Sequence, residues 1–283
     1  MKNKSIGVVG AGTMGNGIAH VFAQHGFSVT LADINPAALE LAVSNIKSNL
    51  NRQLDKGIIN EEEVKAAIDR INISVELKDL SKCCLVIEAV SESFEIKKKI
   101  FKNLDSICNE DTILASNTSS ISINKLASST TRKSRVIGMH FMNPVPIMKL
   151  VEIICGENTS SSTKETIESL SKKINKIPLF CNDSPGFVSN RILMPMINEA
   201  AFCLMEGVAD KEAIDGIMKL GMGHPIGPLK LADLIGIDIC LSIIMVLRQE
   251  FDDPKYDPCP LLEKMVQDRK LGRKTGEGFY KYK

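Results

Sequence analysis

The sequence predicts an α/β fold in which a doubly wound, mostly parallel sheet is followed by an all-helical domain. Up to residue 183, short apolar runs alternate with helical patterns, which favours parallel strands joined by crossover helices. From residue 184 onward the short apolar runs stop, and apolar residues recur at helical spacing. We therefore expect two domains, residues 1–183 and residues 184–283.

A βαβ unit opens the chain. Residues 5–9 form a short apolar run, residues 14–25 have a helical pattern, and residues 28–32 form a second apolar run. Two strands that pair in parallel need a crossover connection, here the intervening helix. We expect both strands to lie side by side in the sheet.

A helical hairpin is expected to follow this unit. Helical patterns cover residues 36–56 and 61–70, and Gly57 marks the break between them. Asn60 is a suitable N-cap for the second helix, because its side chain can accept a hydrogen bond from a backbone N–H of the first turn. The hairpin would project from the sheet as an insertion.

The alternation continues beyond the hairpin. Further strands are expected at residues 71–75, 85–89, 112–115, 136–140, 149–154 and 177–181, with helices at 94–107 and 163–174. The later strands follow one another with short connections, and an antiparallel edge is therefore expected.

The second domain is predicted to be helical throughout. Its helices are expected at residues 186–206, 210–220, 229–251 and 259–269. A piece of about 100 residues buries its apolar surface less completely than a larger domain does. A second copy of the chain would cover the remaining apolar faces, so we expect a homodimer formed through this domain.

The composition argues against several classes of protein. The 35 basic and 34 acidic residues leave a net charge of +1, which gives no reason to expect a nucleic acid or a membrane surface as partner. No run approaches the ~20 apolar residues of a membrane span. The eight cysteines form no C-x-x-C pair and no zinc-type spacing, so we expect reduced thiols in a cytoplasmic protein and no metal.

The turn after the first strand matches the pattern G-x-G-x-x-G. Gly10 allows the tight turn, Gly12 lets the backbone approach a pyrophosphate, and Gly15 lets the helix pack on the strand. Thr13 and Met14 stand where the turn passes into the helix, whose first N–H groups are available to an anion. These features predict the dinucleotide-binding turn of a Rossmann-type fold.

Asp33 indicates which dinucleotide is bound. It ends the second strand, 23 residues after Gly10, where a carboxylate can bind the ribose diol and repel the extra phosphate of NADP. No arginine follows, since the next residues are Ile34-Asn35-Pro36. NAD is favoured over NADP as cofactor, and the glycine pattern taken alone leaves FAD open.

A reaction site is expected in the stretch from Ser116 to Glu152. His140, one of only four histidines, lies within it, and a cluster of hydroxyl residues at 116–120 precedes the histidine. Histidine exchanges protons near neutral pH. The 12 residues that separate His140 from Glu152 fit a strand, a turn and a return strand. From the residues alone, His140 is either an acid–base group or a core histidine bonded to a backbone carbonyl.

Several motifs in this order resemble one known family. Besides the glycine turn they are residues 87–90 (Ile-Glu-Ala-Val), 116–120 (Ser-Asn-Thr-Ser-Ser), 138–141 (Gly-Met-His-Phe), 185–188 (Pro-Gly-Phe-Val) and 272–280 (Gly-Arg-Lys-Thr-Gly-Glu-Gly-Phe-Tyr). Over the full chain they resemble the L-3-hydroxyacyl-CoA dehydrogenases, especially the bacterial, clostridial-type 3-hydroxybutyryl-CoA dehydrogenases. The resemblance implies NAD-dependent interconversion of (S)-3-hydroxyacyl-CoA and 3-oxoacyl-CoA, in fatty-acid or butyrate metabolism.

The resemblance also implies roles for individual residues. His140 matches the catalytic histidine and Glu152 its carboxylate partner, while Ser119 and Asn190 match residues that hold the substrate oxygen near C3. The positions that match NAD contacts are Glu92, Lys97, Ser119, Asn143 and Lys274.

Three residues of the hairpin are candidates for binding CoA. Lys56 matches a lysine that contacts CoA in the family, and Asn49 stands at a CoA position where the family has a serine. Arg52 is a further candidate for the CoA phosphates, because it lies on the same hairpin.

The expected chemistry is hydride transfer coupled to proton transfer. During reduction, negative charge grows on the C3 oxygen, and a protonated His140 can stabilise that charge and deliver the proton. Glu152 would orient the ring and stabilise its cationic form. Two alternatives are a dehydrogenase of a free hydroxy acid or sugar acid and a non-catalytic NAD-binding or structural protein. Arg52 and Lys56 argue against the first alternative, and the complete catalytic set argues against the second.

Overall fold

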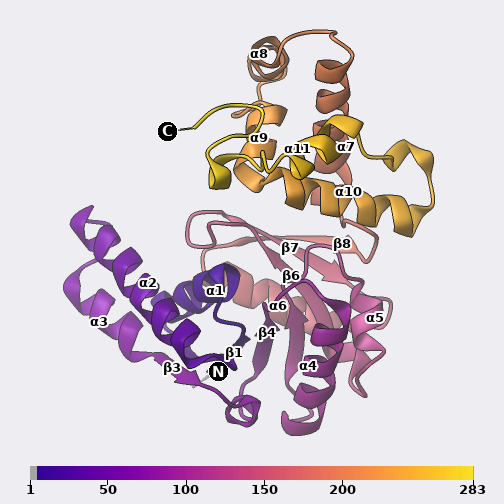
Figure 1. Ribbon diagram of the computed structural model, residues 1–283. Coiled ribbons are helices and arrows are strands. Elements are labelled where there is room, and N and C mark those ends of the chain that lie inside the picture. Colours follow the sequence, from indigo (N-terminus) through magenta and orange to yellow (C-terminus); the bar gives the residue numbers. More distant parts are fainter. Residues whose placement is uncertain (1–4, 283) are drawn as a thin grey trace. The chain divides into compact units, whose positions relative to one another are not determined.

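The computed structural model of the protein describes residues 5–282, which form two compact units divided between Asp183 and Ser184. The first unit is an α/β domain, and the second is built of helices (Figure 1). Within the described range, no helix is long and apolar enough to cross a membrane, and no group of His, Cys, Asp and Glu residues could hold a metal ion.

One sheet of eight strands forms the centre of the first unit, in the order β3-β2-β1-β4-β5-β6-β7-β8. The strands are β1 (Ser5–Val9), β2 (Ser28–Ala32), β3 (Ile71–Ser74), β4 (Leu85–Glu88), β5 (Ile113–Ser116), β6 (Val136–Phe141), β7 (Leu150–Cys155) and β8 (Ile177–Asn182). Strands β1 to β6 pair in parallel, β7 runs antiparallel to β6, and β8 is parallel to β7. The predicted mostly parallel sheet with an antiparallel pair near one edge is confirmed.

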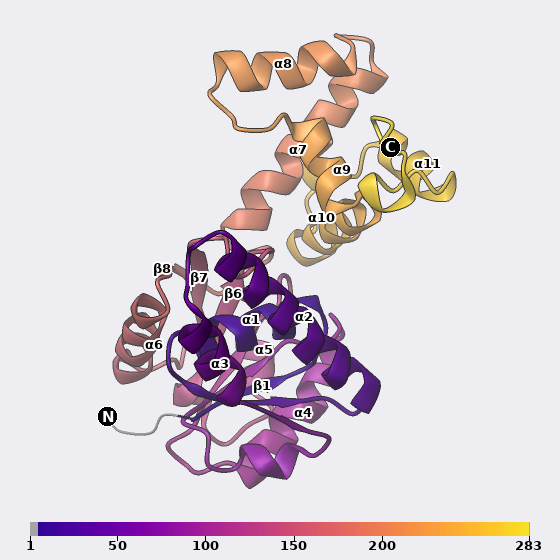
Figure 2. The same cartoon turned by 90° about the vertical axis from the view of Figure 1, so that its left-hand side faces the viewer.

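Helices cover both faces of this sheet (Figures 1 and 2). They are α1 (Thr13–Gln24), α2 (Pro36–Asp55), α3 (Glu61–Asp69), α4 (Phe94–Ile107), α5 (Ile123–Ala127) and α6 (Ser161–Lys173), with short 3-10 turns η1 (Leu77–Leu80) and η2 (Lys133–Arg135). Ile6 and Val8 of β1 share one core with α1 and α6. On the opposite face, Gly138 of β6 packs against Ile123 of α5. His140 points to this second face, because side chains alternate along a strand.

Helices α2 and α3 form the predicted hairpin (Figure 1). A capping box starts α3: Asn60 Oδ1 accepts the Glu63 N–H and Glu63 Oε2 accepts the Asn60 N–H, both at 2.9 Å. Gly57 closes the connection with a φ of 66°, a backbone region that favours glycine. The predicted N-cap at Asn60 is confirmed.

The second unit packs its helices around a separate apolar core. They are α7 (Ser189–Met205), α8 (Lys211–Gly221), α9 (Pro228–Ile235), α10 (Ile237–Phe251) and α11 (Pro260–Gln267), with 3-10 turns η3 (Pro254–Tyr256) and η4 (Arg273–Thr275). The single helix predicted over residues 229–251 is wrong. Gly236 interrupts it with a φ of 109°, which gives two helices instead of one.

The first helix of this unit also differs from its prediction. A helix was expected from residue 186, but α7 begins at Ser189, because Phe187 has a left-handed φ of 53° that no α-helix accommodates. Helix α5 was not predicted at all. Asp183 accepts hydrogen bonds from the Ser122 hydroxyl at 2.7 Å and from Asn124 N at 2.8 Å, and so helps to cap α5.

A buried carboxylate in α9 fastens the segment that follows η4. Asp233 accepts hydrogen bonds from the backbone N–H groups of Phe279 and Tyr280, both at 2.9 Å, and from the Tyr282 hydroxyl at 2.8 Å. Gly278 passes so close that an added Cβ would lie 2.0 Å from Asp233 Oδ1. The hydrogen bonds between Asp233 and this segment therefore require glycine at position 278.

Gly278→Ala is expected to lower the free energy of unfolding by about 1–3 kcal/mol, because the new methyl group must displace the Asp233 carboxylate. Gly216→Ala in α8 is the matched control, since a Cβ there meets nothing within 4 Å. Alanine's better helix propensity should make the control neutral or more stable by up to about 1 kcal/mol. Urea denaturation measures both variants, and an unchanged stability of Gly278→Ala would contradict the packing argument.

Candidate active site

The predicted site residues of the first unit gather where its parallel strands end. Gly10 follows β1 and Asp33 follows β2, while Glu92 and Ser119 come shortly after the last residues of β4 and β5. In doubly wound sheets, ligands bind at this edge, beside the point where the strand order reverses. Here that point lies between β1 and β4.

The glycine turn leaves an open surface for a dinucleotide. A Cβ added at Gly10 would lie 2.7 Å from the carbonyl oxygen of Ala89, which follows β4. A Cβ added at Gly15 would lie 1.7 Å from the carbonyl oxygen of Gly10. At Gly12, by contrast, a Cβ would meet nothing within 4 Å. Thr13 and Met14 open α1, and no side chain caps its N-terminus. The turn therefore fits a pyrophosphate bound by backbone N–H groups.

Asp33 supports the glycine turn from the end of β2. Its Oδ2 accepts the Ala11 N–H at 2.7 Å, and its Oδ1 accepts the Asn35 N–H at 2.9 Å. The side chain is half-buried, whereas Ile34 beside it is 93% exposed. A negative charge thus lies at the edge of the turn, next to an apolar neighbour and no basic one.

His140 and Glu152 form a buried pair across the β6–β7 hairpin. They lie directly opposite each other in the antiparallel register, which puts both side chains on the same face. His140 Nδ1 lies 2.9 Å from Glu152 Oε2, and the two residues are only 7% and 4% exposed. The strand, turn and return strand predicted between these two residues are confirmed.

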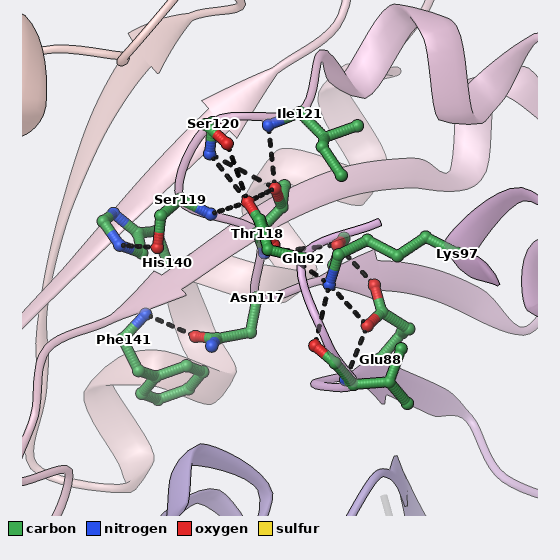
Figure 3. A network of polar contacts seen from close by, with 12 residues as sticks. Glu88, Glu92, Lys97, Asn117, Thr118, Ser119, Ser120, Ile121, His140 and Phe141 are labelled. Carbon is green, nitrogen blue, oxygen red and sulfur yellow. Dashed lines mark hydrogen bonds and ion pairs between the residues drawn. The ribbon is translucent and has the colours of Figure 1, made fainter. Parts of the chain in front are cut away.

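Ser119 extends this pair on the other side of the imidazole ring. Its hydroxyl lies 3.1 Å from His140 Nε2 (Figure 3). With Nδ1 committed to Glu152, Nε2 is the ring nitrogen that can exchange a proton on the Ser119 side. Three residues predicted to be catalytic therefore form one hydrogen-bonded line.

Glu92 holds the turn that carries Ser119 (Figure 3). Its Oε1 accepts from the Thr118 hydroxyl at 2.5 Å, from Ser119 N at 2.8 Å, and from Ser120 N and Oγ at 3.0 Å. Burial alone would raise the pKa of Glu92. The Lys97 ammonium and these donors outweigh burial and hold the pKa below its ordinary value, so the carboxylate is ionised.

Lys97 is fully buried, although the neighbouring lysines of α4 are exposed. Its ammonium lies 2.7 Å from Glu88 Oε1 and 3.3 Å from both Glu92 Oε2 and the Val90 carbonyl oxygen. An ammonium has three N–H donors, and these three acceptors match that number. Any contact of Lys97 with a cofactor would compete with these bonds.

The remaining residues of the predicted cofactor and catalytic set lie elsewhere. Asn143 is exposed in the loop between β6 and β7. Asn190 and Lys274 belong to the second unit: Asn190 is 8% exposed in α7, and Lys274 Nζ lies 2.5 Å from Asp238 Oδ1. The glycine turn and the hydrogen-bonded line through His140, in contrast, both belong to the first unit.

The predicted CoA residues share one side of the hairpin. Asn49, Arg52 and Lys56 are spaced three and four positions apart along α2 and its C-cap, which places them on one helix face. Arg52 and Lys56 are exposed, and Arg52 Nη2 lies 3.5 Å from Ser48 Oγ. Neither of these two basic side chains has an acidic partner within residues 5–282, so both charges are available to an anion.

Sequence reasoning assigned no role to two buried polar residues of the site. Asn117 Oδ1 accepts the Phe141 N–H at 2.9 Å and so fixes the end of β6 beside His140 (Figure 3). Glu88 is fully buried and binds Lys97. One sequence feature could have indicated the role of Glu88: it ends an otherwise apolar strand, and Lys97 follows nine residues later.

Comparisons with known proteins find relatives along the whole chain. Residues 5–184 match the family profile described as "3-hydroxyacyl-CoA dehydrogenase, NAD binding domain". Residues 186–282 match the profile described as "3-hydroxyacyl-CoA dehydrogenase, C-terminal domain".

Individual relatives agree with these profiles. The chain is 54% identical over 282 residues to the "Probable 3-hydroxybutyryl-CoA dehydrogenase" of Bacillus subtilis, covering 100% of this chain and 98% of that protein. It is 50% identical over 277 residues to the 3-hydroxybutyryl-CoA dehydrogenase of Clostridioides difficile, covering 98% and 99%. The crystal structure of (S)-3-hydroxybutyryl-CoA dehydrogenase from Ralstonia eutropha superimposes with a TM-score of 0.96 at 51% identity, over 100% of both chains. The chain therefore belongs to the 3-hydroxyacyl-CoA dehydrogenase family of oxidoreductases.

Proposed function

We propose that the protein interconverts (S)-3-hydroxyacyl-CoA and 3-oxoacyl-CoA with NAD(H), and that its substrate pair is 3-hydroxybutyryl-CoA and acetoacetyl-CoA. The observation that carries the proposal is the hydrogen-bonded line from the Ser119 hydroxyl through the buried His140 to the buried Glu152. The names of the relatives support the choice of substrate. The activity would belong to fatty-acid or butyrate metabolism.

In this proposal His140 moves the proton. When bound, the nicotinamide supplies or accepts the hydride at C3. During reduction, negative charge grows on the C3 oxygen, and a protonated His140 donates from Nε2 to that oxygen. During oxidation, the neutral ring accepts the hydroxyl proton at the same nitrogen.

Glu152 and Ser119 prepare the ring for this transfer. Glu152 accepts the Nδ1–H, which fixes the orientation of the imidazole and stabilises its cation. The Ser119 hydroxyl, 3.1 Å from Nε2, can hold the C3 oxygen next to the nitrogen that reacts. The burial of the His140–Glu152 pair strengthens these interactions by excluding water. The family resemblance adds Asn190 as a further group for the substrate oxygen.

We assign NAD rather than NADP as the cofactor. The Asp33 carboxylate lies at the end of β2, the place where this fold binds the adenosine ribose. A phosphate on that ribose would meet the negative charge of Asp33, and Ile34 offers no positive charge to compensate. Further NAD contacts are proposed for Glu92, Lys97, Ser119, Asn143 and Lys274, by resemblance to the family.

The direct test is the loss of NADH absorbance with acetoacetyl-CoA, measured in parallel with NADPH. We expect turnover with NADH and a much lower rate with NADPH, because of the charge of Asp33. Absence of turnover at micromolar enzyme would contradict the proposed function. Equal rates with the two cofactors would contradict only the choice of NAD.

We also propose that the second unit forms a homodimer. Several large apolar side chains of this unit are exposed, among them Ile217 at 60%, Leu220 at 90% and Met222 at 63%. Ile217 and Leu220 lie three positions apart in α8, so they share one helix face, and neighbouring exposed apolar side chains favour an association site. Sedimentation equilibrium should give the mass of two chains, and the mass of a single chain would contradict the proposal.

A cytoplasmic location is proposed from the state of the cysteines. All eight are free thiols, and burial raises the pKa of Cys108 to about 11 and that of Cys240 to about 12. Buried, protonated thiols of this kind are typical of reducing compartments. Cell fractionation tests this assignment, and recovery of the protein outside the cytoplasm would contradict it.

His140→Gln is expected to lower kcat by ~10²–10⁴-fold, because glutamine cannot exchange a proton with the substrate oxygen. The affinity for NADH should survive, since the glycine turn is untouched. Steady-state kinetics and an NADH fluorescence titration measure the two effects. His25→Gln, at the C-terminal end of α1, is the matched control and should retain the wild-type kcat. A wild-type rate in His140→Gln would remove the residue from its role.

Arg52→Ala and Lys56→Ala should each raise KM for acetoacetyl-CoA by ~3–10-fold, because each removes an exposed positive charge proposed to face the CoA phosphates. The kcat should hardly change, and the effect should shrink as salt screens the charges. Lys47→Ala on the same helix is the control.

If free acetoacetate is reduced as well as the thioester, a dehydrogenase of a free hydroxy acid is favoured instead.

A further inference from the structure

Glu88 is a buried carboxylate that the proposed proton transfer does not use. It ends β4 and is fully buried. Its Oε1 accepts from Lys97 Nζ and from Val90 N, and its Oε2 accepts from the Ser116 hydroxyl, each at 2.7 Å. A carboxylate removed from water is costly unless its oxygens are paired in this way. The partners of Glu88 are therefore an organised set and not an accident of packing.

Lys97 connects Glu88 to Glu92. The ammonium lies 2.7 Å from Glu88 but 3.3 Å from Glu92, and the Glu92 side chain is 38% exposed whereas that of Glu88 is fully buried. Attraction between charges is stronger where water is excluded. Glu88 is thus the partner that determines where the ammonium lies, and Glu92 responds to its position.

Glu92 in turn fixes the turn formed by residues 118–120. One of its oxygens accepts four hydrogen bonds from this turn, and its other oxygen faces Lys97 (Figure 3). The Ser119 N–H is among the four donors, so the backbone of Ser119 is held while its hydroxyl points to His140. A shift of Glu92 would move the backbone that carries this hydroxyl.

We propose that Glu88 is a positioning residue: it holds the Lys97 ammonium beside Glu92, and thereby fixes the 118–120 turn and the direction of the Ser119 hydroxyl toward His140. Its effect on catalysis rests on the proposed function. Its effect on the order of the turn does not, and the two effects can be measured separately. A purely structural Glu88 would only neutralise the buried charge of Lys97.

The first experiment measures the turn without any catalysis. In Glu88→Gln, the backbone amides of Ser119 and Ser120 should exchange hydrogen at least ~10-fold faster than in the wild type, because Glu92 loses a fixed cation and releases them. The amides of β1 should be unchanged. Glu95→Gln is the matched control, because Glu95 lies in the first turn of α4, close to Lys97 in the sequence, but its side chain is 77% exposed. This variant should leave the exchange rates of the Ser119 and Ser120 amides unaltered. Unchanged exchange at Ser119 and Ser120 in Glu88→Gln would overturn the proposal.

The second experiment measures turnover. Glu88→Gln should lower kcat by ~10²-fold, because a small displacement of a reacting group has an effect of this size. The KM for acetoacetyl-CoA should stay near its wild-type value, and kcat is measured at saturating NADH. The affinity for NADH is expected to fall, because the displaced Lys97 and Glu92 are also proposed to contact NAD. If the wild-type enzyme is inactive, the proposed function is contradicted. The hydrogen-exchange rates of Ser119 and Ser120 then decide alone whether Glu88 positions the turn. An active wild type with the same kcat as Glu88→Gln would overturn the positioning role.

A double variant separates positioning from stability, and it also serves if Glu88→Gln does not fold. Glu88→Gln with Lys97→Gln removes both buried charges, so no charge is left unpaired and the thermal midpoint should recover toward the wild-type value. If the two buried charges contributed only to stability, the exchange rates of the Ser119 and Ser120 amides would recover together with stability. We expect these amides to stay labile, because Glu92 still lacks its cation. Wild-type exchange rates at Ser119 and Ser120 in the double variant would overturn the proposal.

Discussion

The candidate active site depends on one reversal of strand direction. Six strands of the sheet run in parallel, and β7 runs against them. Because of this reversal, Glu152 in the interior of β7 lies directly opposite His140 near the end of β6. A pair of cross-strand neighbours is held by the backbone ladder, so the histidine and its carboxylate keep their register without support from a flexible loop. The pair proposed to transfer the proton thereby lies within the hydrogen-bonded sheet.

Around that pair, each of the four carboxylates named below has a defined set of partners. Glu88 and Glu92 share the Lys97 ammonium, and Glu152 faces the imidazole. Asp33 is satisfied by two backbone N–H groups. Buried polar networks are stable only when their members are paired, and once paired they restrict the positions of their members. The site is consequently organised by paired polar side chains that come from strands β4, β6 and β7, from helix α4 and from the segments that follow the strands.

Local signals in the sequence were sufficient for much of this arrangement. The glycine turn, the N-cap at Asn60 and the hairpin that joins His140 to Glu152 all depend on residues close together in the chain, and the structure bears them out. The burial of Lys97 could not be predicted, because three consecutive lysines are typical of a solvated helix face, and the partner that buries this one comes from β4. The break at Gly236 was missed because apolar residues continue at helical spacing on both sides of it. A single glycine within such a pattern does not show whether its φ will be positive.

The contacts of Asp233 have a consequence for the order in which the chain folds during synthesis. Strands and helices of the first unit form their core from residues up to 183, so this unit can fold while the rest of the chain is still being made. The helical unit is in a different position, because the buried carboxylate in α9 finds its donors only in residues 279–282. Until those residues have left the ribosome, Asp233 has a carboxylate without partners at the centre of an incomplete core. The second unit can therefore complete its native packing only after the segment that contains Tyr280 has emerged.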